Sequence, residues 1–303
     1  MGSYYDYEEK VLRIKDGDKS LFPLMFNDFF HIENRLYYEK YFKVIIPNSV
    51  EKIRVHCFSD MHASEYQIPD SVKEIHHSVF RNNDCLKSIQ WPSSAKIISN
   101  FVFYCCKELK KVVLPEGLKK IGIKAFVNCI KLSKIAIPTT VDQIGEEAFL
   151  GCESLKCISL PANVKTIERG TFQQCTSLET VKLFDGLSEI KNEAFASCKS
   201  LITITIPTTV ETFGRGVFRN CEKLKEIYAP KELYNWYGKE YFNDNTSAEV
   251  IPYDEPMNIS TNTIAKPEII TANTIETTAT PKREFRSFNG VIRTNLIANK
   301  KKK

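Results

Sequence analysis

The residues best able to do chemistry in this 303-residue chain are its ten cysteines and five histidines. Six of the cysteines recur at a constant interval of 23 residues: Cys106, Cys129, Cys152, Cys175, Cys198 and Cys221. A thiolate can ligate a metal, attack a substrate or exchange with a disulfide. A free cysteine is also a small and frequently buried hydrophobe, so packing is the alternative use of the column.

The same interval of 23 residues governs the positions around the cysteines. Each unit opens with a proline, or with Phe184 in one case: Pro69, Pro92, Pro115, Pro138, Pro161, Phe184 and Pro207. A phenylalanine follows eleven residues later in every unit: Phe80, Phe103, Phe126, Phe149, Phe172, Phe195 and Phe218. A leucine follows after seventeen residues, and the stretch L-x-x-I-x-I-P alternates like a strand with one buried face.

A period in the twenties is typical of a solenoid in which each unit forms one coil. We therefore expect an α/β repeat solenoid with a parallel sheet on its concave face and short turns or helical turns on its convex face. Gly122, Gly145 and Gly214 directly follow the position that is isoleucine in most units, and there we expect a turn with positive φ.

The unit P-x-x-V-x-x-I-G-x-x-A-F-x-x-C-x-x-L-x-x-I-x-I is nearly pure from Pro138 to Leu160 and resembles the BspA-like class of leucine-rich repeat. The resemblance covers Pro69 to Ala229 and, in degenerate form, Pro47 to Ile68. It implies surface adhesion and binding of protein or matrix in bacteria and anaerobic protozoa, without a fixed set of functional residues.

The remaining segments predict the domain organisation. Residues 1–46 should form an N-terminal cap, and 47–229 the leucine-rich repeat solenoid, with 47–68 degenerate and 69–229 in seven repeats. Residues 230–242 should form a capping helix, because Leu233, Trp236, Tyr237 and Tyr241 have helical spacing. Residues 243–303 are rich in Thr, Asn and Pro and should form a disordered basic tail.

The cysteine column lies between the Phe and Leu core positions, so we interpret it as packing, although neighbouring coils would also allow disulfides. Cys157 differs, since the strand pattern points it outward between Lys134 and Thr180. A nearby lysine favours thiolate. No histidine lies in the adjacent coils to act as a base, so an exposed bystander is the preferred interpretation over a thiol-dependent activity.

Four histidines, His56, His62, His76 and His77, lie near Cys57 and Cys85 in the first coils. Histidines and cysteines grouped in this way are compatible with a metal site, yet their spacings match no ligand motif. The chain also lacks a P-loop, G-x-S-x-G and H-E-x-x-H. We therefore predict a protein that is not an enzyme and has no catalytic residue, metal or cofactor.

The remaining candidate for a functional site is the outward face of the sheet, which is polar and weakly basic. Its candidate partner-binding residues are Ser88, Gln90, Lys111, Lys134, Cys157, Ser159, Thr180, Lys182, Thr203, Thr205, Glu226 and Tyr228. Repeat solenoids bind through such surfaces. The sequence therefore predicts a non-enzymatic scaffold for protein–protein interaction, with an acidic protein favoured as the partner.

The net charge of +5 lies mainly near the end, where residues 281–303 hold eight Lys or Arg and one acid. The body therefore predicts no specific binding of nucleic acid. The alternative function is a polybasic-tailed protein addressed to the nucleus or to an anionic membrane, with weak contact through Lys300, Lys301, Lys302 and Lys303. No apolar stretch is long enough to span a membrane. Without a signal peptide pattern we expect a cytoplasmic location, with an unconventional route to the cell surface as the alternative.

Overall fold

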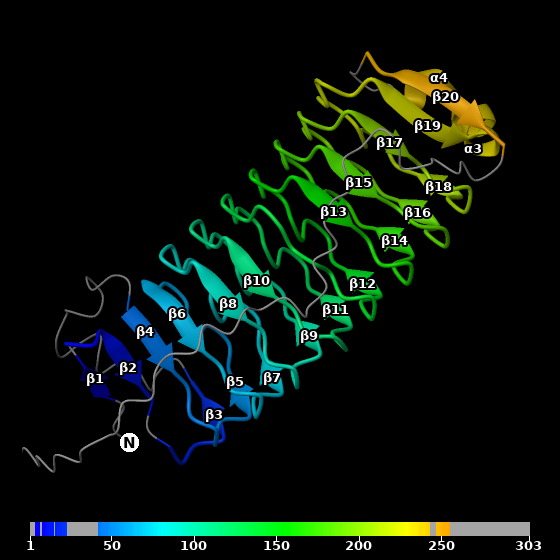
Figure 1. The fold of residues 1–303 in the computed structure, drawn as a ribbon. Coiled ribbons are helices and arrows are strands. Elements are labelled where there is room, and N and C mark those ends of the chain that lie inside the picture. The colour runs from blue at the N-terminus through cyan, green and yellow to red at the C-terminus, as the bar shows by residue number, and fades with distance from the viewer. Residues whose placement is uncertain (1–3, 7, 15, 23–41, 243–246, 255–303) are drawn as a thin grey trace, which may run out of the picture. The chain divides into compact units, whose positions relative to one another are not determined.

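The computed structural model describes residues 4–6, 8–14, 16–22, 42–242 and 247–254. These residues form a stack of parallel β-coils, and all coils but one place a strand in a main row (Figure 1). The main row contains β2 (Val11–Arg13), β4 (Phe42–Ile45), β6 (Ala63–Gln67), β8 (Ser88–Gln90), β10 (Lys111–Val113), β13 (Cys157–Ser159), β15 (Thr180–Lys182), β17 (Thr203–Thr205), β19 (Glu226–Pro230) and β20 (Glu249–Tyr253). The repeat solenoid with a parallel sheet, predicted from the period of 23, is confirmed.

A second row of two-residue strands lies on another side of the coils and was not predicted. It contains β3 (Ser20–Leu21), β5 (Lys52–Ile53), β7 (Glu74–Ile75), β9 (Ile97–Ile98), β11 (Lys120–Ile121), β12 (Gln143–Ile144), β14 (Thr166–Ile167), β16 (Glu189–Ile190) and β18 (Thr212–Phe213). Each strand buries one apolar residue and turns the other outward, which is polar except for Ile97 of β9. Two residues are too few to show a period of two, so the sequence pattern did not indicate these strands.

The main row is interrupted at one coil. Residues 132–137 form no strand, and the strand pairing stops at β10 on one side and resumes at β13 on the other (Figure 1). Leu132 and Ile135 of this coil are nevertheless buried. The coil therefore keeps its place in the core while its backbone leaves the sheet ladder.

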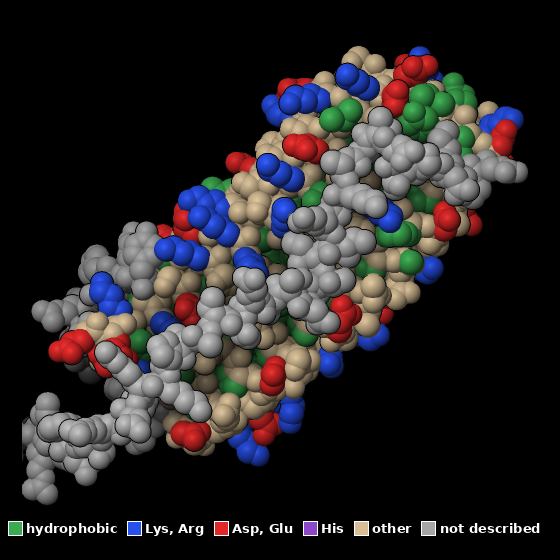
Figure 2. All heavy atoms as spheres, in the orientation of Figure 1, with side chains coloured by type: hydrophobic (Ala, Val, Ile, Leu, Met, Phe, Trp, Pro, Cys, Tyr) green, Lys and Arg blue, Asp and Glu red, His purple; other side chains and the backbone are tan. Residues whose placement is uncertain are grey.

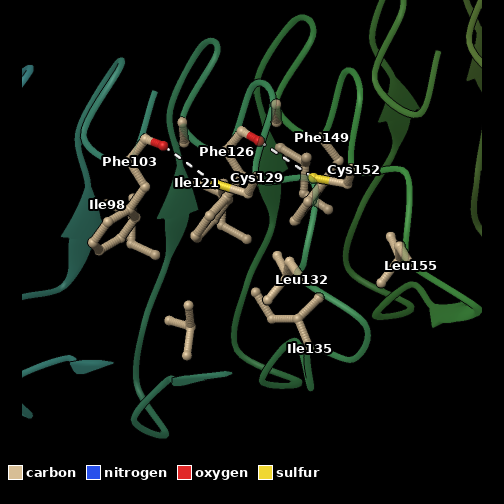
Figure 3. Packing of buried hydrophobic residues seen from close by; sticks show 14 of the residues in the cluster. Ile98, Phe103, Ile121, Phe126, Cys129, Leu132, Ile135, Phe149, Cys152 and Leu155 are labelled. Carbon is tan, nitrogen blue, oxygen red and sulfur yellow. Dashed lines mark hydrogen bonds between the residues drawn. The ribbon is translucent and has the colours of Figure 1, made fainter. Parts of the chain in front are cut away.

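The core is a column of stacked phenylalanine rings that runs through the coils. The rings of Phe58, Phe80, Phe103, Phe126, Phe149, Phe172, Phe195 and Phe218 follow one another with centroid distances of 5.2 to 6.0 Å. All of them are less than 2% exposed. Figure 3 shows part of this column with the leucine and isoleucine side chains packed beside it. A coil alone could not bury such a ring on both faces, so stacking supplies the core.

The side of each coil that carries neither row turns through two left-handed residues. One lies nine residues after the start of each unit: Ser78, Phe101, Lys124, Glu147, Gly170, Glu193 and Gly216. The other lies four residues further on: Asn82, Cys105, Asn128, Gly151, Gln174, Ser197 and Asn220. No helix occurs within the coils of the described part of the chain, because these turns reverse the backbone too soon.

The positive φ expected at Gly122, Gly145 and Gly214 was wrong, because the left-handed residues lie elsewhere. These glycines instead lie against the backbone of the preceding coil. A Cβ at Gly145 would lie 2.5 Å from the Ile123 nitrogen, and one at Gly214 would lie 2.3 Å from the Asn192 nitrogen. Their function is close approach between coils.

Strands occur in both end segments predicted from the sequence to be a cap and a tail. Strands β2 and β3 lie in the segment predicted as a cap and extend both rows, and β1 (Tyr4–Asp6) adds an antiparallel strand to β2. At the other end, β20 pairs in parallel with β19, so one strand of the stack lies within the predicted tail. The missed signal is "EVIPY", whose alternation resembles the strand ends of the repeat. The other predicted features of the tail lie outside the described residues.

Two short helices, α3 (Lys231–Tyr237) and α4 (Lys239–Phe242), lie in the segment predicted as a capping helix. Leu233 is buried, and the Tyr241 hydroxyl donates a hydrogen bond to the Phe213 carbonyl at 3.2 Å. Trp236 does not join this face, since it is 84% exposed. Grouping Trp236 with the buried stripe was therefore wrong, because it lies only one residue before Tyr237 and points away from the packed side.

Candidate functional site

The main row of strands presents two outward columns of side chains, one on each side of a buried column. The register pairs Ser88 with Lys111 and Gln90 with Val113, then Cys157 with Thr180 and Ser159 with Lys182, then Thr203 with Glu226 and Thr205 with Tyr228. The residues between them, such as Ile89, Ile158 and Ile204, are buried. The predicted binding residues therefore lie on one face, which we call the outer face of the main row.

Lys134 is the exception among these residues, because its coil has no strand. It is still exposed, and it follows Ile130 and Ser133, whose carbonyls accept hydrogen bonds from the next coil at 3.1 and 3.3 Å. Lys134 therefore lies between Lys111 and Cys157 on the face, although its coil forms no strand pairing.

Four lysines form a basic patch on the outer face and its edge: Lys110, Lys111, Lys134 and Lys156. All four are exposed, and within the described residues none of them forms an ion pair. The amide of Lys110 bonds to the carbonyl of Lys87, and that of Lys156 bonds to the carbonyl of Ser133, so these positions stack coil upon coil. Figure 2 shows blue side chains following the edge at which the strands of the main row begin.

Several cations elsewhere on the coils are paired with a carboxylate from an adjacent coil. The pairs include Lys52–Glu74 at 2.7 Å, Lys131–Glu108 at 2.6 Å and Lys191–Glu168 at 2.8 Å. Arg169 contacts Glu146, Glu147 and Glu193. Its hydrogen bond to Glu146 contributes most to raising the pKa of its guanidinium. The lysines of the basic patch form no such pair among the described residues, although Glu179 follows Lys156 at the same position of the next coil.

The outer face changes character toward its C-terminal end. Glu226 lies opposite Glu249 in the register, and the Tyr228 hydroxyl donates a hydrogen bond to Glu226 at 3.0 Å. That hydrogen bond is the main cause that raises the pKa of Tyr228. Between the two ends, Lys182 lies 4.7 Å above the Phe184 ring. The face is thus basic in its middle coils and acidic at its last strands.

Several residues of this face were missed by the sequence analysis. Strands β4 and β6 add Lys43 and Glu65, which form an ion pair at 2.8 Å, and β20 adds Glu249 and Ile251. The segments "KVIIP" and "SEYQIP" end like the repeat strands, and this signal would have found β4 and β6.

Cys157 lies on the outer face, half-buried, where it pairs in register with Thr180. The described histidines closest to it in sequence, His76 and His77, belong to coils well before its own. Its surroundings therefore contain no imidazole that could act as a base from the adjacent coils.

The cysteine column is buried and makes one repeated contact. Each thiol donates a hydrogen bond of 3.0 to 3.3 Å to a phenylalanine carbonyl of the preceding coil, as Cys129 does to Phe103 and Cys152 to Phe126 (Figure 3). Asn83 occupies the column in the first regular coil, and its amide donates to the Phe58 carbonyl at 2.6 Å. Burial raises the pKa of these thiols, to about 12 for Cys175 and Cys221. They are therefore protonated and serve as packing donors.

The histidines and cysteines of the first coils do not gather at one point. The rings of His56 and His77 face each other with centroids 5.8 Å apart, and His76 lies 3.5 Å from Glu74. Cys57 is buried elsewhere, and burial raises the pKa of its thiol. Only His62 comes together with a cysteine and a carboxylate among the described residues, namely Cys85 and Asp84.

No helix among the described residues has the length and apolar character that crossing a membrane requires. Lys300, Lys301, Lys302 and Lys303, proposed from the sequence as a weak membrane contact, lie outside the described residues.

Comparison with known proteins agrees with the repeat seen in the structure. The model of the BspA type leucine rich repeat region, in six copies, matches residues 31–156 and 142–266. The crystal structure of a leucine-rich repeat protein from T. pallidum is similar over 83% of this chain and 96% of its own, with 22% identity and a TM-score of 0.51. This likeness shows the fold.

A leucine rich cell surface protein from Faecalibacterium prausnitzii is 26% identical, with a TM-score of 0.47 over 75% of this chain. The match takes in 52% of that protein, so the chain spans about half its length. A search of curated proteins found no match. Because the family model matches most of the chain and the coils carry its repeat, the chain belongs to the BspA-type leucine-rich repeat family.

Proposed function

We propose that this chain is a non-enzymatic protein-binding scaffold that holds an acidic protein partner on the basic patch of its outer face. The observation that carries the proposal is the cluster of Lys110, Lys111, Lys134 and Lys156, which are exposed on three successive coils and form no ion pair among the described residues. A partner would supply the missing carboxylates, and such complementary charge gives specificity and a fast association.

The remainder of the outer face suits a polar interface. Ser159, Thr180 and Thr203 provide hydroxyl donors and acceptors on three successive coils, with steps of ~4.8 Å. The acidic end at Glu226 and Glu249 repels an acidic partner, so it favours one position along the row. Membership in a family of repeat scaffolds supports binding rather than catalysis as the use of this face.

The family also supports the cell surface as the place of action, in preference to the cytoplasmic location expected from the sequence. Adhesion would then be the biological setting of the same binding face. The nucleus and the anionic membrane remain proposals that rest on the basic tail alone.

The test is a triple charge reversal of Lys111→Glu, Lys134→Glu and Lys156→Glu. Proteins captured by the full chain would be identified, and the affinity of an acidic one would be measured by calorimetry for the original and the variant. Exposed ion pairs contribute up to ~1 kcal/mol each, so three reversals should weaken binding by roughly 30-fold. The original interaction should also weaken as salt is added.

The matched control reverses Lys96, Lys119 and Lys165, which are exposed on the same or the adjacent coil and lie just before strands of the second row. It changes the net charge of the chain by the same amount, so a general charge effect would weaken both variants equally. We expect the control to bind within about twofold of the original. Equal affinity of the patch variant and the original chain would refute the proposal.

A further inference from the structure

Three different metal-binding groups meet where two successive coils adjoin near the start of the solenoid. The His62 imidazole and the Asp84 carboxylate are 2.6 Å apart, measured from Nδ1 to Oδ1. A ligand atom of each of these residues and the Cys85 sulfur all lie within 4.8 Å of one another. We propose that His62, Asp84 and Cys85 form a binding site for a divalent transition metal ion, and that Zn²⁺ suits it best.

The chemistry of the three groups selects the class of metal. A thiolate and an imidazole are soft or borderline ligands that bind Zn²⁺ well, whereas Ca²⁺ and Mg²⁺ take oxygen ligands. Binding would release the Cys85 proton to solvent, because the thiolate is the ligand. Three protein ligands leave one tetrahedral position for a water or for a donor from a bound molecule.

The geometry requires only small movements of side chains. With Zn–N and Zn–O distances of ~2.0 Å and Zn–S of ~2.3 Å, tetrahedral ligand atoms lie roughly 3.3 to 3.5 Å apart. The His62 and Asp84 atoms must therefore separate by about 0.7 Å to admit an ion between them. The Asp84 side chain is 43% exposed and the His62 side chain is 21% exposed, so solvent leaves room for this change.

The backbone around the three residues is held in place before any ion binds. Asn83, between Asn82 and Asp84, is fully buried, and its amide bonds to the carbonyls of Phe58 and Phe80 while the Tyr66 hydroxyl donates to it. On the His62 side, the Asp60 amide bonds to the Arg81 carbonyl at 2.8 Å. Such support limits the entropy that a metal ion must overcome to assemble its ligands.

The repeat itself does not require these residue types. His62 and Asp84 both lie fifteen residues after the proline that opens their unit, and Cys85 follows directly. The later units place other residues at this position: Lys107, Ile130, Glu153, Thr176, Lys199 and Glu222. None of them is followed by cysteine. The combination therefore occurs once in the repeats, at the place where the coils bring the three groups together.

Titration of Zn²⁺ into the reduced, metal-free full chain, in competition with a chromophoric chelator, tests the proposal. We expect one tightly bound equivalent, and Co²⁺ in its place should give the charge-transfer absorption of a cobalt–thiolate bond. Cys85→Ser should abolish that absorption. His62→Gln and Asp84→Asn should each weaken Zn²⁺ binding at least tenfold, since even outer-shell partners have effects of roughly 10- to 100-fold.

The matched control is Cys105→Ser, which removes a half-buried thiol from a turn of the next coil without touching the three ligands. It should bind Zn²⁺ like the original chain. Thermal unfolding in metal-free buffer shows whether each variant folds, and the partly exposed His62→Gln decides the question if Cys85→Ser does not. Absence of a tight equivalent would mean that His62 and Asp84 form only an ion pair. Undiminished binding by folded His62→Gln would place the ion elsewhere, and either result overturns the proposal.

Discussion

At the residue scale, the cysteine column is explained by a hydrogen bond that each thiol makes to the coil before it. The donor must be small, because the position lies between a phenylalanine ring and a leucine, and it must reach the carbonyl of a phenylalanine. Asn83 meets the same need with an amide, which shows that the donor rather than the sulfur is what the first regular coil requires. The same carbonyl also accepts the backbone N–H three residues further along its own coil, as Phe103 does from Cys106 at 3.1 Å, so the thiol is its second donor.

The phenylalanine column predicts a large cost for removing one ring. Phe149 is fully buried and stacks on Phe126 at 5.2 Å and on Phe172 at 5.5 Å. Phe149→Ala should lower the free energy of unfolding by ~3–5 kcal/mol, because it leaves a cavity that the flanking coils cannot fill. Urea unfolding followed by circular dichroism measures this loss. Phe101→Ala serves as a control, since Phe101 lies outside the column, and an unchanged midpoint for Phe149→Ala would contradict the assignment.

At the element scale, the coil is shaped by where its backbone turns and where it touches the coil before it. Two left-handed residues per coil make the reversal, and several are not glycine, as with Glu147 and Gln174. Glycine at the seventh position after the start of a unit has another function. At Gly145 and Gly214 the backbone of the preceding coil occupies the space that a Cβ would need. Close approach and positive φ are thus separate demands, which different positions of the repeat satisfy.

This separation predicts that Gly145→Ala destabilises the stack although its φ is not in the left-handed region. The added Cβ would lie 2.5 Å from the Ile123 nitrogen and 2.7 Å from the Gly122 carbonyl carbon, so the two coils must move apart. Overpacking of this kind costs ~1–3 kcal/mol. Lys191→Ala, at the equivalent position of a coil that already carries a side chain, should cost less than about 1 kcal/mol through its exposed ion pair. Equal losses in thermal unfolding would refute the role of close approach.

At the scale of the whole molecule, the stacked thiols make stability depend on alkaline pH. Burial raises the pKa of all six thiols of the column, which titrate near 8.5 when unfolded. Because the folded pKa lies above the unfolded one, the stability that each thiol contributes is complete below about pH 8.5 and is lost as the pH rises toward the folded value.

The free energy of unfolding should therefore fall above about pH 8.5, by up to ~1.4 kcal/mol per pH unit for each buried thiol that unfolds. Urea unfolding in reducing buffer, at a series of pH values from about 7.5 to 10, measures the slope. Cys175→Ala should reduce the slope by the share of one thiol. A stability independent of pH in this range would contradict the protonated buried column.

The period of 23 residues by itself determined the parallel main row, the buried phenylalanine, leucine and cysteine columns, and the family. It did so because a repeated local pattern leaves only a stack of coils in which to bury its apolar side. The outward position of residues such as Lys111 and Thr203 followed from strand alternation alone. A binding role for them remains a prediction.

Only the tertiary structure decided features that depend on contacts between coils. The strands of the second row are two residues long and are defined by their pairing with adjacent coils. Two residues are too short to show an alternating pattern in the sequence. The space at Gly145 is set by the backbone of another coil, and β20 is fixed by its pairing with β19. His62 meets Asp84 and Cys85 because one coil stacks on the next, 22 residues further along the chain. Stacking brings residues of adjacent coils into contact although they are far apart in the sequence. Sequence spacing alone therefore does not identify such contacts.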